Sequence, residues 1–192
     1  IRNYIISKGG TFLFNTKVVD FNIFNGKIIS VSCLNKDNLQ KISASHVILA
    51  IGHSSRDTFE KLYEKGINME KKNFSVGVRI EHLQEEINKS QYGSFTNLKL
   101  PPAEYKLAYH SPNTGRSCYT FCMCPGGVVM ASSSEKNTIV SNGMSNFLRN
   151  GKNANSALLV NVTPADFLNK SALAGIYFQK SLEAKVNAFS SK

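Results

Sequence analysis

The feature that most constrains this chain is an unbroken apolar run, Val47–Ile51, which ends at Gly52 and passes directly into small polar residues. Strands that alternate between apolar and polar residues have one face in water, whereas strands that are apolar on both faces lie inside sheets covered on both sides. We therefore expect residues 45–52 to form a central strand. A run this short is also compatible with a buried helix, so the flanking segments are needed to choose between strand and helix.

Two strand-like segments precede this run and predict a meander. Residues 11–21 alternate and are rich in aromatic and β-branched side chains, and residues 27–34 are predicted to pair with them. The Asn25-Gly26 dipeptide between the two segments favours positive φ at both positions, which predicts a two-residue hairpin turn. Residues 35–43 are polar and are predicted to be a loop that leads into the apolar strand.

Helical and strand patterns are mixed along the rest of the chain, which predicts an α+β fold. Glycines just past an amphipathic segment are typical helix ends. The helices expected are residues 1–8, 54–66, 83–93 and the segment from about 163 onward. The strands expected are residues 74–82, 157–163 and a hairpin of 117–124 with 128–134 across Pro125-Gly126-Gly127, and residues 134–156 are expected to be a long polar connection.

The formal net charge is +10, from 23 Lys and Arg against 13 Asp and Glu. Such a charge suits nucleic acid or an anionic ligand. The basic residues are nevertheless spread along the chain, and the densest group, residues 60–72, is interleaved with acids on an expected helix. This pattern favours a solvated basic surface over a nucleic-acid partner.

The compartment expected is the cytoplasm. Four cysteines without repeated spacing, in a chain with no recognisable secretion signal, indicate reduced thiols. No apolar run is long enough to cross a bilayer, so no membrane partner is expected.

Three of the cysteines, Cys118, Cys122 and Cys124, are predicted to lie on one face of a strand because all occupy even-numbered positions. A rise of roughly 3.3 Å per residue separates the outer two by about 20 Å, so a regular strand does not bring them to one metal ion. A bulge would bring Cys122 and Cys124 closer as a redox pair. The alternative is that they are small buried hydrophobic side chains. No metal site is expected.

Two stretches rich in glycine and asparagine are candidates for ligand contact. A Pro-Gly-Gly loop exposes backbone amides, although it is also an ordinary turn. Long polar connections in compact domains are often functional. The residues singled out are Gly126 and Gly127 in the first stretch, and Asn142, Gly143, Asn153 and Asn155 in the second. Arg79 and Arg149 are candidates for binding an acidic substrate or a phosphate, with a surface role as the alternative.

The order of helix, Gly-Gly, meander and apolar strand ending in glycine resembles the second half of the FAD-binding domain of the two-dinucleotide-binding-domain flavoproteins. With the segments "FSVGVRIEH", "YTFCMCPGG", "SNGMS" and "GKNANSALLVNVTPADF", the chain is similar to one bacterial family of FAD-dependent dehydrogenases. The resemblance covers essentially the whole chain, although "AIGH" stands where the superfamily has Ala-Thr-Gly. Because no Gly-x-Gly-x-x-Gly motif is present, the chain is expected to be an internal fragment of a longer enzyme.

The resemblance implies that residues 1–55 are the C-terminal part of a Rossmann-like FAD/NAD(P)-binding domain and residues 56–192 an α+β substrate-facing domain. It implies that Val18 contacts the adenine through its backbone, and that Ile51 and Gly52 lie near the cofactor, FAD. Cys122, Cys124 and the polar connection would then face the flavin. The implied partners are a small-molecule substrate, an electron donor and the rest of the parent polypeptide.

A basic nucleic-acid- or partner-binding module without catalytic activity is the alternative. A flavoprotein fold can persist without its chemistry, so the fold alone does not establish an activity.

Overall fold

The computed structural model describes residues 1–94 and 99–190, which form two compact units that divide after Met69. Helices and antiparallel sheets are both present, so the predicted α+β class is confirmed. The assignment of residues 1–55 and 56–192 to domains of stated function stays a prediction.

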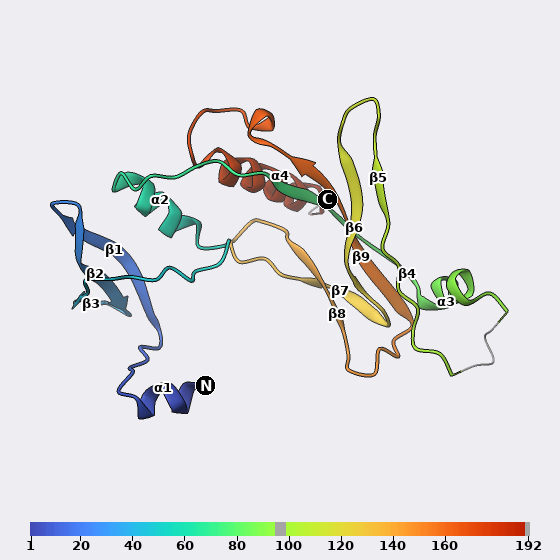
Figure 1. Ribbon diagram of the computed structural model, residues 1–192, viewed down its shortest axis with the longest axis horizontal. Coiled ribbons are helices and arrows are strands. Elements are labelled where there is room, and N and C mark those ends of the chain that lie inside the picture. The colour runs from blue at the N-terminus through green and yellow to red at the C-terminus, as the bar shows by residue number, and fades with distance from the viewer. Residues whose placement is uncertain (95–98, 191–192) are drawn as a thin grey trace. The chain divides into compact units, whose positions relative to one another are not determined.

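The first unit is built around the predicted hairpin. Helix α1 (Arg2–Ser7) precedes an antiparallel sheet of β1 (Thr16–Phe24), β2 (Lys27–Asn35) and β3 (Asn38–Ser43), in that order (Figure 1). Asn25 and Gly26 have φ values of 49° and 71°, which confirms the turn expected between β1 and β2. Helix α2 (Arg56–Glu64) follows, as the sequence predicts.

The third strand of the meander is not the one predicted. The polar segment expected to be a loop forms β3, in which half-buried Gln40 and Ile42 alternate with exposed neighbours. Such alternation is typical of a strand with one face exposed to solvent. The apolar run Val47–Ile51 is not a strand, and Ile48 is 93% exposed. A strand requires a neighbour to complete its hydrogen-bond ladder, and no described strand pairs with this run.

A small core joins the meander to helix α2. Phe21, Val31, Cys33 and Leu62 are buried together, and Ile28, Ile42 and Met69 pack against them. Leu62 is the residue of α2 in this core, so the apolar face of the helix packs against the meander.

The second unit contains a four-stranded antiparallel sheet in the order β4-β9-β6-β5 and a separate two-stranded ribbon, β7-β8 (Figure 1). The sheet strands are β4 (Phe74–Leu83), β5 (Ala108–His110), β6 (Ser117–Cys124) and β9 (Asn153–Val162). The ribbon strands are β7 (Gly127–Ala131) and β8 (Ser141–Ser145). The helices are α3 (Gln84–Tyr92), the 3₁₀ turn η2 (Pro164–Asp166) and α4 (Ala174–Ser190).

The predicted hairpin between β6 and β7 is wrong. β6 pairs with β5 and β9, whereas β7 pairs with β8. The Pro-Gly-Gly segment therefore carries the chain from the sheet to the ribbon. The polar connection expected over residues 134–156 also contains β8 and the start of β9, because small polar residues suffice for strands that pack closely.

A β-bulge interrupts β6 where it pairs with β9. Phe121 stands opposite Ala157 and Cys124 stands opposite Asn155, so β6 has one residue more than β9 over this interval. Cys122 lies in the bulge with a φ of 51°, a value that residues other than glycine adopt infrequently.

The bulge places Cys118 and Cys124 on opposite faces of the sheet. Partners in an antiparallel pair point to the same side, and Cys118 pairs with Val160 whereas Cys124 pairs with Asn155. Val160 and Asn155 are separated by an odd number of residues along β9 and so face opposite ways. The prediction that Cys118, Cys122 and Cys124 share one face is therefore wrong, because the inserted residue reverses the alternation.

The two faces of this sheet have different characters. One, named here the Arg79 face, carries Arg79, Glu81, Asn155 and Cys124. The other face packs against an apolar core beside α4. The residues of this core are Phe74, Val76, Val162, Phe167, Ala174 and Phe178.

Candidate functional site

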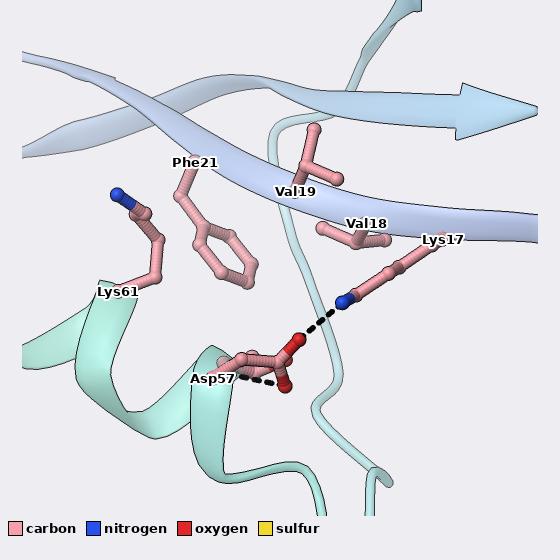
Figure 2. Close-up of a pocket in the computed structure, with 7 residues that line it drawn as sticks. Lys17, Val18, Val19, Phe21, Asp57 and Lys61 are labelled. Carbon is pink, nitrogen blue, oxygen red and sulfur yellow. Dashed lines mark hydrogen bonds and ion pairs between the residues drawn. The ribbon is translucent and has the colours of Figure 1, made fainter. Parts of the chain in front are cut away.

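A shallow pocket in the first unit lies between β1 and the start of α2 (Figure 2). Its volume is about 120 Å³. The β1 side presents apolar groups together with the charged Lys17, and the α2 side presents polar and charged groups. The lining residues are Lys17, Val18, Val19, Phe21, Asp57, Thr58 and Lys61.

An ion pair between Lys17 and Asp57 spans this pocket (Figure 2). The hydrogen bond from Lys17 is the largest cause that holds the pKa of Asp57 below its ordinary value, and the Thr58 backbone N–H also donates to its Oδ1 over 2.9 Å. The carboxylate therefore stays ionised at the first turn of α2, where negative charge is favoured.

Of the three residues implied by the adenine-side resemblance, Val18 lines this pocket and the other two lie in the segment before α2. The Ile51 carbonyl accepts a 2.9 Å hydrogen bond from the Ser55 hydroxyl. Gly52 has a φ of 66°, which glycine adopts without strain. Neither Ile51 nor Gly52 lines the pocket.

The second unit brings several of the predicted residues together around Arg79. Its Nη1 donates to Asn155 Oδ1 over 2.6 Å and to the Cys122 carbonyl over 3.2 Å, and lies 3.9 Å from Cys124 Sγ. Asn155 is completely buried, and its Nδ2 has no hydrogen-bond partner among the described residues. One donor of the cluster, Asn155 Nδ2, therefore lacks an acceptor among the described residues.

Glycines allow the β7-β8 ribbon to lie directly on this cluster. A Cβ at Gly143 would collide with Asn155, Arg79 and Cys124. A Cβ at Gly127 would collide with Met144 and Ser145 of the facing strand. Close packing thus accounts for both residues without requiring a ligand.

A buried glutamine, Gln84, binds the backbone of Gly126. Gln84 Oε1 accepts from the Gly126 backbone N–H over 2.9 Å, while Gln84 Nε2 donates to the Ala103 carbonyl over 3.0 Å and to Asn88 Oδ1 over 2.9 Å. Gly126 itself has a φ of 57°, and a Cβ there would collide with the Arg149 carbonyl. The Pro-Gly-Gly segment is therefore fixed by its surroundings.

The remaining predicted residues lie around the ribbon. Asn153 Nδ2 donates to Glu81 Oε1 over 2.6 Å, and Glu81 Oε2 accepts from the Val129 backbone N–H over 2.9 Å. Asn142 is exposed and accepts from the Gly143 backbone N–H over 2.8 Å. Arg149 forms an ion pair with Glu104, so its charge is already matched.

The two candidate redox cysteines differ in exposure. Cys122 is exposed and Cys124 is buried, and both are free thiols. The bulge foreseen as a way to bring them together is present. Their redox role stays a prediction.

Sequence reasoning missed Glu81, Gln84, Lys17 and Asp57. Glu81 carried a usable signal, because it lies two residues from Arg79 on a predicted strand and must share its face. Gln84 carried none, since a glutamine at a helix start is usually exposed. The pairing of Lys17 with Asp57 depends on the tertiary packing of α2 against β1.

No group of three or more metal-ligating side chains occurs in residues 1–94 and 99–190. Over the same residues, no helix combines the length and apolarity that a bilayer crossing requires.

Comparison with known proteins identifies a family for this chain. The family model described as "FAD-dependent protein, C-terminal domain-like" matches residues 73–192. A relative from Clostridium beijerinckii, described as an uncharacterized protein, is 48% identical over 185 residues, which are 96% of this chain and 34% of the relative. The chain thus spans about a third of that relative's length. Since the family model matches more than half of the chain and nearly all of the second unit, the chain belongs to this family of FAD-dependent proteins.

Proposed function

We propose that this chain is the central part of a cytoplasmic FAD-dependent oxidoreductase of the dehydrogenase type. The first unit would complete a Rossmann-like domain and supply part of the adenine-side cofactor site, and the second unit would face the substrate. The family match across residues 73–192 is the observation that carries this proposal. A bound flavin would supply hydride or electron transfer, while the protein binds and orients.

The pocket beside Val18 supports the cofactor-binding part of the proposal. Sites that enclose whole drug-sized ligands have about 300 Å³ or more, so a smaller pocket suits one end of a dinucleotide. β1 is an edge strand, and edge strands keep some backbone N–H and C=O groups outside the ladder. The apolar walls at Val18 and Phe21 suit a flat base, and these backbone groups suit its polar rim. The residues present therefore fit an adenine.

The segment before α2 supports the same site less directly. Ile51 and Gly52 lie where the extended apolar run ends, and the positive φ of Gly52 allows the chain to turn without a side chain in the way. Because this run is not a strand, the support for these two residues is the resemblance of the segment to the flavoprotein strand that runs toward the cofactor. We therefore keep Ile51 and Gly52 as proposed cofactor contacts.

In the second unit, the proposed flavin-facing surface is the margin of the ribbon. Cys122 and Asn142 are exposed there and are free to contact a ligand. Gly126, Gly127, Gly143, Asn153 and Asn155 shape the surface from beneath through the contacts described above. Cys122 and Cys124 would be the redox-active pair.

The test is the visible absorption spectrum of the complete protein after incubation with FAD and desalting. A retained flavin spectrum is the expected result. Val18→Trp would fill the pocket and is expected to weaken FAD binding by about tenfold or more, roughly 1.4 kcal/mol per factor of ten. The matched control is Ile29→Trp, because Ile29 is an exposed side chain of β2.

A folded, colourless protein would contradict the flavoenzyme proposal. Binding of mixed oligonucleotides that falls steeply with added salt would then favour the nucleic-acid alternative. Turnover of an electron donor with an artificial acceptor would separate an active enzyme from a cofactor-binding module without chemistry.

A further inference from the structure

Arg79 is a half-buried cation without a carboxylate partner in the described part of the chain. All three of its polar contacts use one nitrogen, Nη1, and reach Asn155 Oδ1, the Cys122 carbonyl and Cys124 Sγ. None of these acceptors carries a formal charge. Charged groups that are partly removed from water are normally paired with an opposite charge, so this guanidinium differs from the ion-paired Arg116 and Arg149.

The acid nearest to Arg79 along the same face of β4 is held elsewhere. Glu81 accepts from Asn153 Nδ2 at one carboxylate oxygen and from the Val129 backbone N–H at the other. Both oxygens are therefore engaged in fastening the ribbon and β9. The fold therefore places an acid two residues from Arg79 on the same face, and no ion pair joins the two among the described residues.

A second donor beside Arg79 also lacks an acceptor. Asn155 is completely buried, and because its Oδ1 accepts from Arg79, its Nδ2 points elsewhere and has no partner among the described residues. Buried amide donors are almost always satisfied, and exceptions call for an explanation such as a bound ion or a functional role. The uncompensated positive charge of Arg79 favours a negatively charged ligand, and the unsatisfied Asn155 N–H shows that the polar groups of this cluster are not completed by the described residues.

The geometry favours a carboxylate among the possible anions. Anchoring through Nη1 fixes the plane of the guanidinium and leaves Nε and Nη2 as a parallel pair of donors. That pair matches the two oxygens of a planar carboxylate. Phosphate sites commonly add backbone N–H groups at a helix N-terminus or a lysine, and no such group contacts Arg79 in the residues described.

We propose that Arg79, held by Asn155 and the Cys122 carbonyl, binds the carboxylate of the substrate, and that the exposed Cys122 lies at the margin of the same site. This inference names the substrate class and so rests on the proposed function, although carboxylate binding itself does not require the flavin. Asn155 is a positioning residue that orients the guanidinium. Gly143 completes the site by leaving room for Arg79 beneath the ribbon.

The experiment is isothermal titration of the complete protein with benzoate, succinate and octanoate, with benzamide as the neutral counterpart of benzoate. At least one carboxylate is expected to bind and benzamide is not. Arg79→Gln is expected to weaken that binding by about tenfold or more. Arg79→Lys keeps the charge but loses the paired donors, so its affinity for the carboxylate is expected to lie between those of the wild type and Arg79→Gln. Arg149→Gln, the loss of an ion-paired arginine in the same unit, is the matched control and should bind as the wild type does.

Several outcomes overturn the inference. They are no binding of any of the three carboxylates, equal binding in Arg79→Gln and the wild type, or displacement of the carboxylate by inorganic phosphate at equal concentration. Circular dichroism of each variant separates lost binding from lost folding, and Arg79→Lys remains informative if Arg79→Gln does not fold. Because the heat of binding is measured without reference to flavin, a colourless protein that binds carboxylate would contradict the proposed function and leave the Arg79 site standing.

Discussion

Arg116 and Asp166 lie 50 residues apart in the chain and meet as a bidentate ion pair, in which Nη1 donates to Oδ2 over 3.2 Å and Nη2 donates to Oδ1. The same Nη1 donates to the Asn161 carbonyl over 2.9 Å, and Asp166 Oδ2 accepts from the Thr163 backbone N–H over 2.7 Å. The pair therefore ties the start of β6 to the turn that follows β9.

This ion pair predicts a specific dependence of stability on pH. The hydrogen bond from Arg116 is the main cause that lowers the pKa of Asp166 from 3.8 to about 2. A carboxyl group whose pKa is lower in the folded state adds stability that is complete above its unfolded pKa and is lost as the pH falls through the folded value. We expect Arg116→Gln to lower the melting temperature at pH 7, and the difference from wild type to shrink as the pH falls through about 2, where the lost hydrogen bond to the Asn161 carbonyl remains as its part that does not depend on pH.

Thermal melts of the complete protein at both pH values measure this effect. Lys72→Gln is the control, because Lys72 and Glu70 form a highly exposed pair that is expected to contribute little. A difference between Arg116→Gln and wild type that is unchanged near pH 2 would show that the ion pair is not its cause.

Gly143→Ala is predicted to destabilise the second unit. Gly143 has no positive φ, so the added methyl group acts only through its collision with Arg79, Asn155 and Cys124. Overpacking of this kind costs about 1–3 kcal/mol. Urea unfolding measures the loss, and Met144→Ala is the control, since Met144 is 58% exposed on the same strand. A neutral Gly143→Ala would mean that the ribbon does not lie on the Arg79 cluster.

Gln84→Ala is predicted to cost about 1–3 kcal/mol, because it leaves the buried Gly126 N–H and Ala103 carbonyl without partners. Gln91→Ala is the matched control, because Gln91 is an exposed glutamine of the same helix. The free energy of unfolding in urea is the measurement. Equal values for the two variants would contradict the role given to Gln84.

Cys122 is predicted to react with a maleimide faster than Cys33, Cys118 or Cys124 in the folded protein, because it is the exposed thiol of the four. Peptide mapping by mass spectrometry after short labelling times identifies the modified residue. Unfolding in urea should make the four rates similar. Preferential labelling of Cys124 would contradict the burial that the bulge imposes.

The sequence predicted those elements whose determinants are local. The Asn25-Gly26 turn, helix α2 after Ser55 and strand β4 all depend on a few adjacent residues, and all are present. The pairing of β6 with β9, by contrast, joins segments more than 30 residues apart, and Pro-Gly-Gly looks like a hairpin turn whichever strands it joins. Local chemistry indicates a turn but not which strands pair across it.

The candidate site was predictable in its residue types and not in its geometry. Arg79, Asn155 and Cys124 were each singled out, but their meeting depends on a register that the bulge in β6 shifts by one residue. The even-number rule for the cysteines is sound for a regular strand and fails at Cys122. The apolar run Val47–Ile51 likewise has the composition of a strand but lacks a pairing strand among the residues described.

The bulge in β6 has a consequence for how this strand tolerates changes in length. Every substitution at Cys124 leaves the new side chain beside Arg79, whereas deletion of one residue from the bulge would restore simple alternation. Phe121 and Cys124 would then be two residues apart in a regular ladder, opposite Ala157 and Asn155, so Cys124 would keep its side chain on the Arg79 face. The bulge can therefore absorb the loss of one residue without changing which side chains of β6 lie beside Arg79, and the other strands keep their register.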